Sequence, residues 1–76
     1  MEKIIFDFSA LRGRIVERFG TCTALAAAVG MKPDVLSSRL SNSTKFKPEE
    51  IYALCEPDVL DIPEAGIRKY FFTPKV

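Results

Sequence analysis

The sequence predicts an all-α domain, and three observations support this. Apolar residues recur at three- and four-residue intervals near the start of the chain, at Phe8, Leu11, Ile15 and Phe19, which is the period of an amphipathic helix. Glycine and proline then stand where such helices would end and begin. At 76 residues, the chain is expected to form a single domain, residues 1–76, around one small core.

We expect five helices, each bounded by local signals in the sequence. Asp7 or Ser9 can cap the first helix and Gly20 ends it, whereas Thr21 caps the second. Pro48 opens the fourth, and Pro57 interrupts it. The expected ranges are about 8–19, 22–29, 32–41, 48–56 and 63–69.

The two ends of the chain differ in character from the middle. Residues 3–7 (KIIFD) and 70–73 (YFFT) are rich in β-branched and aromatic side chains, which favour extended structure. These segments either pair as short strands or pack over the helices as apolar tails.

The stretch from Cys22 to Asn42 has the spacing of a helix-turn-helix. Gly30 can take positive φ and end one helix, and Pro33 suits the first turn of the next. Ala26 lies four residues before the glycine, where the second helix must cross closely. Leu36 and Leu40 repeat at i, i+4 on the inner face of that helix. This motif, at residues 22–42, predicts duplex DNA binding; the alternative is an ordinary helical hairpin.

Charge is distributed unevenly along the chain. The net charge is only +1, yet residues 9–47 carry seven cations against two anions, and the remainder carries four cations against eight anions. This asymmetry is what a surface facing a polyanion would need. The alternative is that these cations simply lie on solvated helix faces.

Several classes of function are disfavoured by what the sequence lacks. There is no histidine, and Cys22 and Cys55 do not form a C-x-x-C pair, so neither a zinc site nor the commonest general base is available, and we expect no bound metal. We therefore expect no enzyme, no cofactor and no small-molecule substrate. Without a signal peptide or a long apolar run, and with unpaired cysteines, we expect a cytoplasmic protein that does not enter a membrane.

The segment FSALRGRIVERFGT (residues 8–21), the helix-turn-helix after it and the ending YFFTPKV (residues 70–76) resemble a family of short phage and prophage proteins. Members begin with an F-x-x-L-R-G-R-I-like segment, finish near Y-F-F-x-x-K-V and are of the Cro and C1-repressor type. The resemblance implies a compact five-helix, phage-repressor-like helix-turn-helix domain that binds DNA. The chain departs from this pattern at Lys32-Pro33, where a serine cap often occurs, and at Glu56-Pro57-Asp58.

Docking geometry assigns candidate contacts within the motif. The start of the recognition helix meets base edges in the major groove, so the expected base contacts are Lys32, Asp34, Ser37 and Ser38. Amides at the start of the preceding helix and cations beyond the motif suit phosphates. The expected phosphate contacts are Thr21, Cys22, Thr23, Arg39, Lys45 and Lys47, although Arg39 could instead cover apolar surface with its stem.

These observations predict a phage-type transcriptional regulator that binds double-stranded DNA as a repressor-like protein. A lone domain would read only a short half-site, so we expect a homodimer that uses the apolar ends. The alternative is a helical protein-interaction module, antirepressor-like, that does not bind DNA. The modest net charge and the acidic later half of the chain support that alternative.

Overall fold

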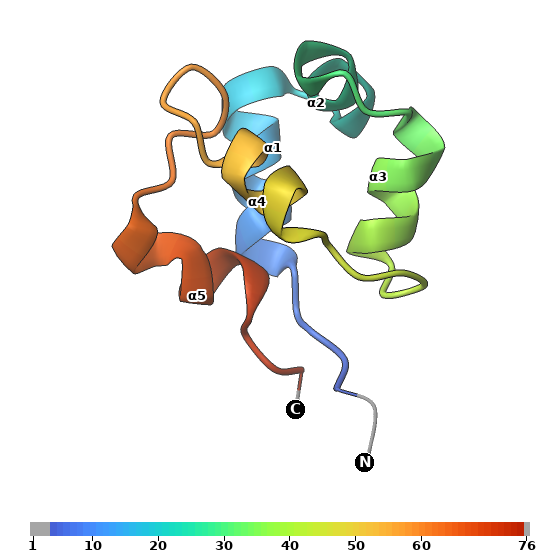
Figure 1. Ribbon diagram of the computed structural model, residues 1–76, viewed down its shortest axis with the longest axis vertical. Helices are drawn as coiled ribbons and strands as arrows, with labels where there is room; N and C mark the ends of the chain where they lie inside the picture. The colour runs from blue at the N-terminus through green and yellow to red at the C-terminus, as the bar shows by residue number, and fades with distance from the viewer. Residues whose placement is uncertain (1–3, 76) are drawn as a thin grey trace.

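The computed structural model describes residues 4–75 of the chain. Lys3, which belongs to the predicted N-terminal extended segment, and the outermost parts of the predicted domain lie outside the described residues. Residues 4–75 fold into five α-helices, as the sequence predicts, with one short 3₁₀ helix before the last (Figure 1). Their bounds are α1 Ser9–Phe19, α2 Cys22–Val29, α3 Pro33–Leu40, α4 Pro48–Leu54, η1 Glu64–Gly66 and α5 Ile67–Phe71.

Helix α1 presents its predicted apolar stripe to the core. Leu11 and Ile15 are fully buried, and Phe8 is buried just before the helix begins. The helix ends at Gly20, whose φ of 82° is readily accessible only to glycine. The amide of Gly20 donates to the carbonyls of Ile15 and Val16, so the last turn is closed without a side-chain cap.

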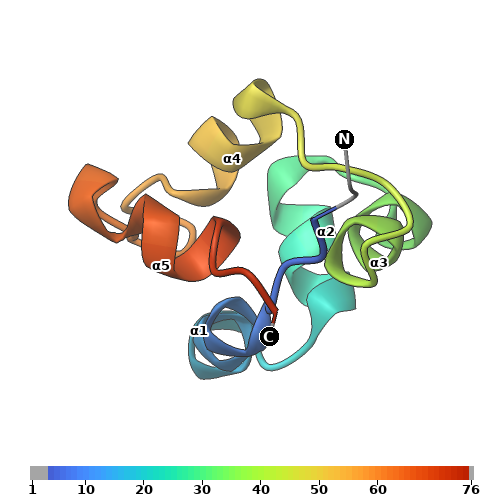
Figure 2. The same ribbon diagram turned by 90° about the horizontal axis from the view of Figure 1, so that it is seen from below.

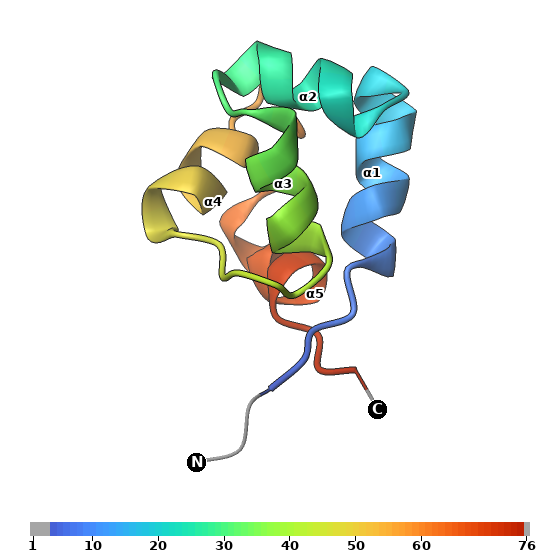
Figure 3. The same ribbon diagram turned by 90° about the vertical axis from the view of Figure 1, so that its right-hand side faces the viewer.

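The helices enclose one hydrophobic core. Helix α2 runs across the ends of α1 and α3 (Figure 3) and packs against both, while α1 also packs against α5. The view from below shows α3 and α5 on opposite sides of the bundle (Figure 2). The buried core residues are Phe8, Leu11, Ile15, Leu25, Ala26, Leu36, Leu40, Leu54, Leu60, Ile62 and Phe71.

The last part of the chain differs from the prediction in detail. Pro63 precedes a 3₁₀ turn rather than an α-helix, and α5 begins only at Ile67 and extends to Phe71. Phe71 is buried in the core. The burial of this ring extends the helix beyond the polar residue Lys69, at which the sequence pattern predicted its end.

The two ends meet in extended conformation, but residues 4–75 contain no regular strand. A single antiparallel bridge joins Phe6 to Pro74, with the Asp7 amide donating to Thr73 O at 2.7 Å and the Lys75 amide donating to Ile5 O at 2.8 Å. Pro74 has no N–H, so it cannot donate to a longer ladder. On the other edge of Phe6, the Asn42 side chain accepts from its amide and donates to its carbonyl, both at 3.0 Å.

Candidate functional site

The α2–turn–α3 unit is built from local signals. The Thr21 hydroxyl accepts from the Ala24 amide at 3.1 Å and caps α2. Gly30 then adopts a left-handed conformation, with φ 75° and ψ 21°. The Met31 amide closes the turn by donating to Ala26 O at 2.9 Å. The fully buried Ala26 leaves room for α3 to cross closely.

The outer face of α3 carries the residues predicted to contact bases. Lys32, Asp34 and Ser37 are exposed, and Ser38 is half-buried. The structure therefore brings one cation and one anion to the start of this helix. Their charges offset each other, so the face offers little net attraction to a polyanion.

The residues predicted to bind phosphate through the start of α2 are dispersed between surface and core. Thr21 and Thr23 are exposed, but the Thr21 hydroxyl already accepts from Ala24. Cys22 is half-buried and packs against the hydrophobic core.

Lys47, another predicted phosphate contact, is exposed at the start of α4, where its amide donates to Glu50 Oε1 at 2.8 Å.

Arg39 is held inside the protein by Glu50. Its guanidinium donates to both carboxylate oxygens, at 2.8 and 3.0 Å, and a third nitrogen donates to the Thr44 hydroxyl at 2.6 Å. Both side chains of the pair are largely buried, at 12% and 16% exposure. These hydrogen bonds, which Arg39 donates and the Glu50 carboxylate accepts, lower the pKa of Glu50 and raise the pKa of Arg39. Bidentate pairing joins α3 to α4 and engages most of the donors of this arginine.

Lys45 also has a partner within the chain. Its ammonium donates to Ile4 O at 3.0 Å and lies 5.4 Å from the centre of the Phe6 ring. These contacts attach the segment between α3 and α4 to the N-terminal segment. Lys45 remains exposed, and its predicted contact with a phosphate stays a prediction.

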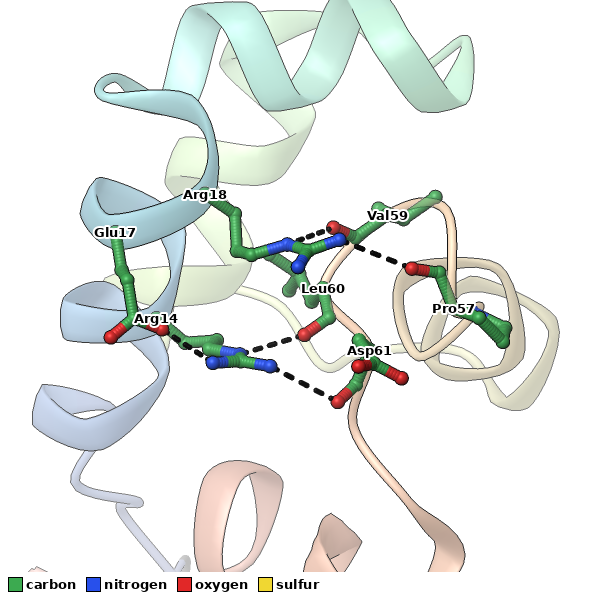
Figure 4. Close-up of polar contacts among 7 residues, drawn as sticks. All are labelled: Arg14, Glu17, Arg18, Pro57, Val59, Leu60 and Asp61. Atoms are coloured by element: carbon green, nitrogen blue, oxygen red, sulfur yellow. Dashed lines mark hydrogen bonds and ion pairs between the residues drawn. The ribbon is translucent and has the colours of Figure 1, made fainter.

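Two arginines of α1 bind the loop that follows α4 (Figure 4). Arg14 donates to Leu60 O at 2.7 Å and to Asp61 O at 3.2 Å, and it also pairs with Glu17. Arg18 donates to the carbonyls of Val59 and Pro57, each at 3.1 Å. We call these four bonds to backbone carbonyls the α1 clamp.

The cation-rich part of the chain is therefore largely engaged by the protein itself. Of its seven cations, Arg14, Arg18, Arg39 and Lys45 have intramolecular hydrogen-bond partners at ordinary distances. Their charge is used to fix loops and helix ends. Among the described residues, only Arg14 and Arg39 are paired with a carboxylate. The exposed cations of this part are Arg12, Arg18, Lys32, Lys45 and Lys47.

The sequence analysis missed an apolar groove on another face of the molecule. It lies between the end of α4 and the η1–α5 segment and has a volume of about 400 Å³. Tyr52 lines it and is 75% exposed, an unusual exposure for a large aromatic ring. No local sequence pattern indicated this groove, because it forms between α4 and the η1–α5 segment, which are separated by the loop of residues 55–63.

A solved structure provides the comparison with a characterised protein. The solution structure of the modulator of repression (MOR) of the temperate bacteriophage TP901-1 from Lactococcus lactis is similar, with a TM-score of 0.75. The two proteins are 34% identical, and the match covers 88% of each chain. No curated protein matches the chain.

This similarity overturns the prediction of a DNA-binding repressor. The similar phage protein is a modulator of repression, so the prediction of double-stranded DNA as the partner was wrong. The ion pairs of Arg39 with Glu50 and of Arg14 with Glu17 offset two of the positive charges in the cation-rich part. The predicted homodimer loses its basis as well, because it was inferred from the need to read two DNA half-sites. The individual contacts predicted for the motif residues stay predictions of the sequence.

The family assignment also requires correction. The sequence resemblance pointed to the Cro and C1-repressor type, but the family whose model matches residues 4–74 is a different one. The match spans almost the whole described chain, including the predicted motif and most of both end segments. The chain belongs to the family described as "Protein of unknown function (DUF739)".

Proposed function

We propose that this chain is a protein-interaction module that binds a phage repressor protein and changes the repression it exerts. The observation that carries the proposal is its similarity to a phage modulator of repression over 88% of both chains at 34% identity. The largely buried pairing of Arg39 with Glu50 removes one cation from the surface, which supports a protein partner in preference to a nucleic acid. This function corresponds to the antirepressor-like alternative in the sequence analysis.

The site of action follows from the partner. A repressor acts on DNA inside the host cell, so we propose that the chain works in the cytoplasm. Within the described residues, no helix has the length and apolar character needed to cross a membrane. The lack of enzymatic activity stays a prediction of the sequence.

Binding to the repressor encoded in the same phage or prophage genome tests the proposal. Calorimetric titration should give saturable binding to that repressor and none to the repressor of an unrelated phage. Fluorescence anisotropy of a labelled operator should change when the chain is added to the repressor–operator complex. The chain alone should bind duplexes weakly and without sequence preference, and Lys32→Ala and Ser38→Ala should leave that weak binding unchanged. Absence of binding to the cognate repressor would overturn the proposal.

A further inference from the structure

The groove beside α4 has an apolar floor. Ile62 is almost completely buried beneath it, and Cys55 and Ile67 are half-buried and pack against the core. Burial raises the pKa of the Cys55 thiol, which keeps this side chain in its neutral form. The groove, of about 400 Å³, is large enough to receive one or two apolar side chains of a partner.

Tyr52 stands at the edge of this floor. It is the most exposed of the large hydrophobic side chains in the described structure, at 75%, while Leu54 two residues later is fully buried. Tyrosine provides a large, rather rigid contact area with a polar tip. Such residues are enriched among those that contribute most to binding between proteins.

The charges that line the groove are all negative. Glu56 and Glu64 border it, both are exposed, and neither forms an ion pair among residues 4–75. The nearby cations Arg68 and Lys69 line a separate hollow with Ala65 and Phe72. The groove therefore combines an apolar floor with two unpaired carboxylates, which favours a partner segment carrying lysine or arginine.

The groove is already formed in the isolated chain. The α1 clamp fixes the carbonyls of residues 57, 59, 60 and 61, and Pro57 and Ile62 at either end of this loop line the groove. Arg14 and Arg18 are thus positioning residues for the wall (Figure 4). A preformed wall lowers the entropic cost of binding.

We propose that this groove binds a basic amphipathic segment of a partner protein, with an apolar side chain on its floor and lysine or arginine beside Glu56 and Glu64. The proposal rests on the proposed function only for the identity of that partner, the repressor. A second copy of this chain is a poorer occupant. Two-fold pairing of the groove with itself would bring the same carboxylates together.

The affinity of groove variants for the repressor, compared with that of matched control variants, tests this proposal. We expect Tyr52→Ala to weaken binding at least 10-fold and the double variant Glu56→Lys/Glu64→Lys to weaken it roughly 30-fold or more. The controls lie away from the groove: Val16→Ala on α1 changes another exposed apolar residue, and Asp34→Lys on α3 reverses another exposed charge. Both controls should stay within about 2-fold of the parent, and circular dichroism should show all variants folded.

A second arm uses a probe that does not depend on the repressor. The probe is a 14-residue helical peptide with leucine at i, i+3, i+4 spacing and arginine on its polar face, and the control peptide carries glutamate instead. In an NMR titration of the labelled chain, the arginine peptide should shift residues that line the groove. The glutamate peptide should not, and the double variant should not respond to either.

The two arms separate this inference from the proposed function. If the repressor binds the groove variants and the parent equally, the groove is not the binding surface, although the proposed function stands. If the repressor does not bind but the arginine peptide maps to the groove, the inference stands and the proposed function fails. Sedimentation that shows a dimer abolished by Tyr52→Ala would assign the groove to a second copy and overturn the inference.

Discussion

The arginines of this protein act chiefly as internal hydrogen-bond donors. A guanidinium offers five N–H groups on a long stem, so Arg14 and Arg18 can reach from α1 to the carbonyls of a loop about 40 residues away in sequence. The amides of Val59, Leu60 and Asp61 donate to backbone carbonyls before the loop, whereas the carbonyls that the two arginines reach accept from no backbone amide among the described residues. The positive charge matters less here than the geometry of the donors.

The first prediction tests the α1 clamp. Arg18→Ala removes two hydrogen bonds to loop carbonyls, and we expect it to lower the free energy of unfolding by about 1–2 kcal/mol. Urea denaturation measures this change. Lys32→Ala is the control, since this exposed side chain has no hydrogen-bond partner among the described residues. Equal midpoints for Arg18→Ala and the parent would show that the clamp does not hold the loop.

The second prediction concerns the pH dependence of the Arg39–Glu50 pair. Hydrogen bonds from Arg39 lower the pKa of Glu50 below its ordinary value of 4.5. Its folded pKa is lower than its unfolded pKa, so the pair stabilises the fold above pH 4.5 and loses this contribution as the pH falls through the folded pKa. Urea midpoints between pH 7 and 2.5 should therefore show Glu50→Gln less stable than the parent at pH 7, with the difference shrinking below pH 4.5.

Glu49→Gln is the matched control for this pH series. Glu49 is the exposed neighbour of Glu50 on α4 and belongs to no ion pair of residues 4–75. The same chemical change there should have little effect at either end of the pH range. A difference between Glu50→Gln and the parent that persists unchanged to pH 2.5 would contradict the assignment.

At the scale of the elements, local signals specified some boundaries and long-range packing specified others. The ends of α1 and α2 follow from Gly20, Thr21 and Gly30, whose effects extend only a few residues, so the sequence predicted them closely. The end of α5 depends on the burial of Phe71 among residues distant in sequence. No local pattern encodes that contact, and the prediction ended the helix too early.

The third prediction compares two glycines. Gly30 has φ 75° and Gly13 lies within α1, and a Cβ at either position would meet nothing within 4 Å. An added methyl group would therefore clash with no neighbouring atom at either position, and the comparison reports only the effect of the backbone conformation. Gly30→Ala should lower the free energy of unfolding by about 1–2 kcal/mol because of its left-handed backbone. Gly13→Ala should raise it by about 0.5–1 kcal/mol through helix propensity.

Thermal or urea denaturation should show a lower midpoint than the parent for Gly30→Ala and a higher midpoint for Gly13→Ala. Ala26→Leu extends the test, because a larger side chain at this fully buried position should cost about 1–3 kcal/mol. Parent-like stability of both Gly30→Ala and Ala26→Leu would mean that the α2–α3 junction is loose and that its tight crossing is incorrectly described.

At the scale of the whole molecule, net charge and charge asymmetry do not identify the partner. The sequence allowed both a DNA-binding domain and a protein-interaction module, because the two share a helical hairpin and a cation-rich segment. The distinction depends on whether the cations face solvent or bond within the chain. Contacts such as Arg39 with Glu50 and Arg18 with Pro57 are not encoded in any local spacing, so sequence reasoning could name the candidates without choosing between them.

An aromatic cluster joins distant parts of the chain into one unit. Phe46, in the segment between α3 and α4, makes edge-on contacts with Phe8 at 5.4 Å and with Phe71 at 5.2 Å between ring centres. Phe8 precedes α1 and Phe71 ends α5. The cluster therefore links both ends of the fold to its middle, and a substitution within it should destabilise the whole molecule.

The fourth prediction tests this cooperativity with Phe71→Leu. Truncation to alanine would cost about 3–5 kcal/mol, which is comparable with the whole stability expected of so small a core, so leucine is the informative change. We expect a loss of about 1–2 kcal/mol in the free energy of unfolding, with Tyr52→Leu, at an exposed position, as the control. Amide hydrogen exchange should show the same loss for the most protected amides of α1, α2 and α5, because a domain with one core opens as a unit. A loss confined to α5 would contradict this account and show that the last helix unfolds independently of the bundle.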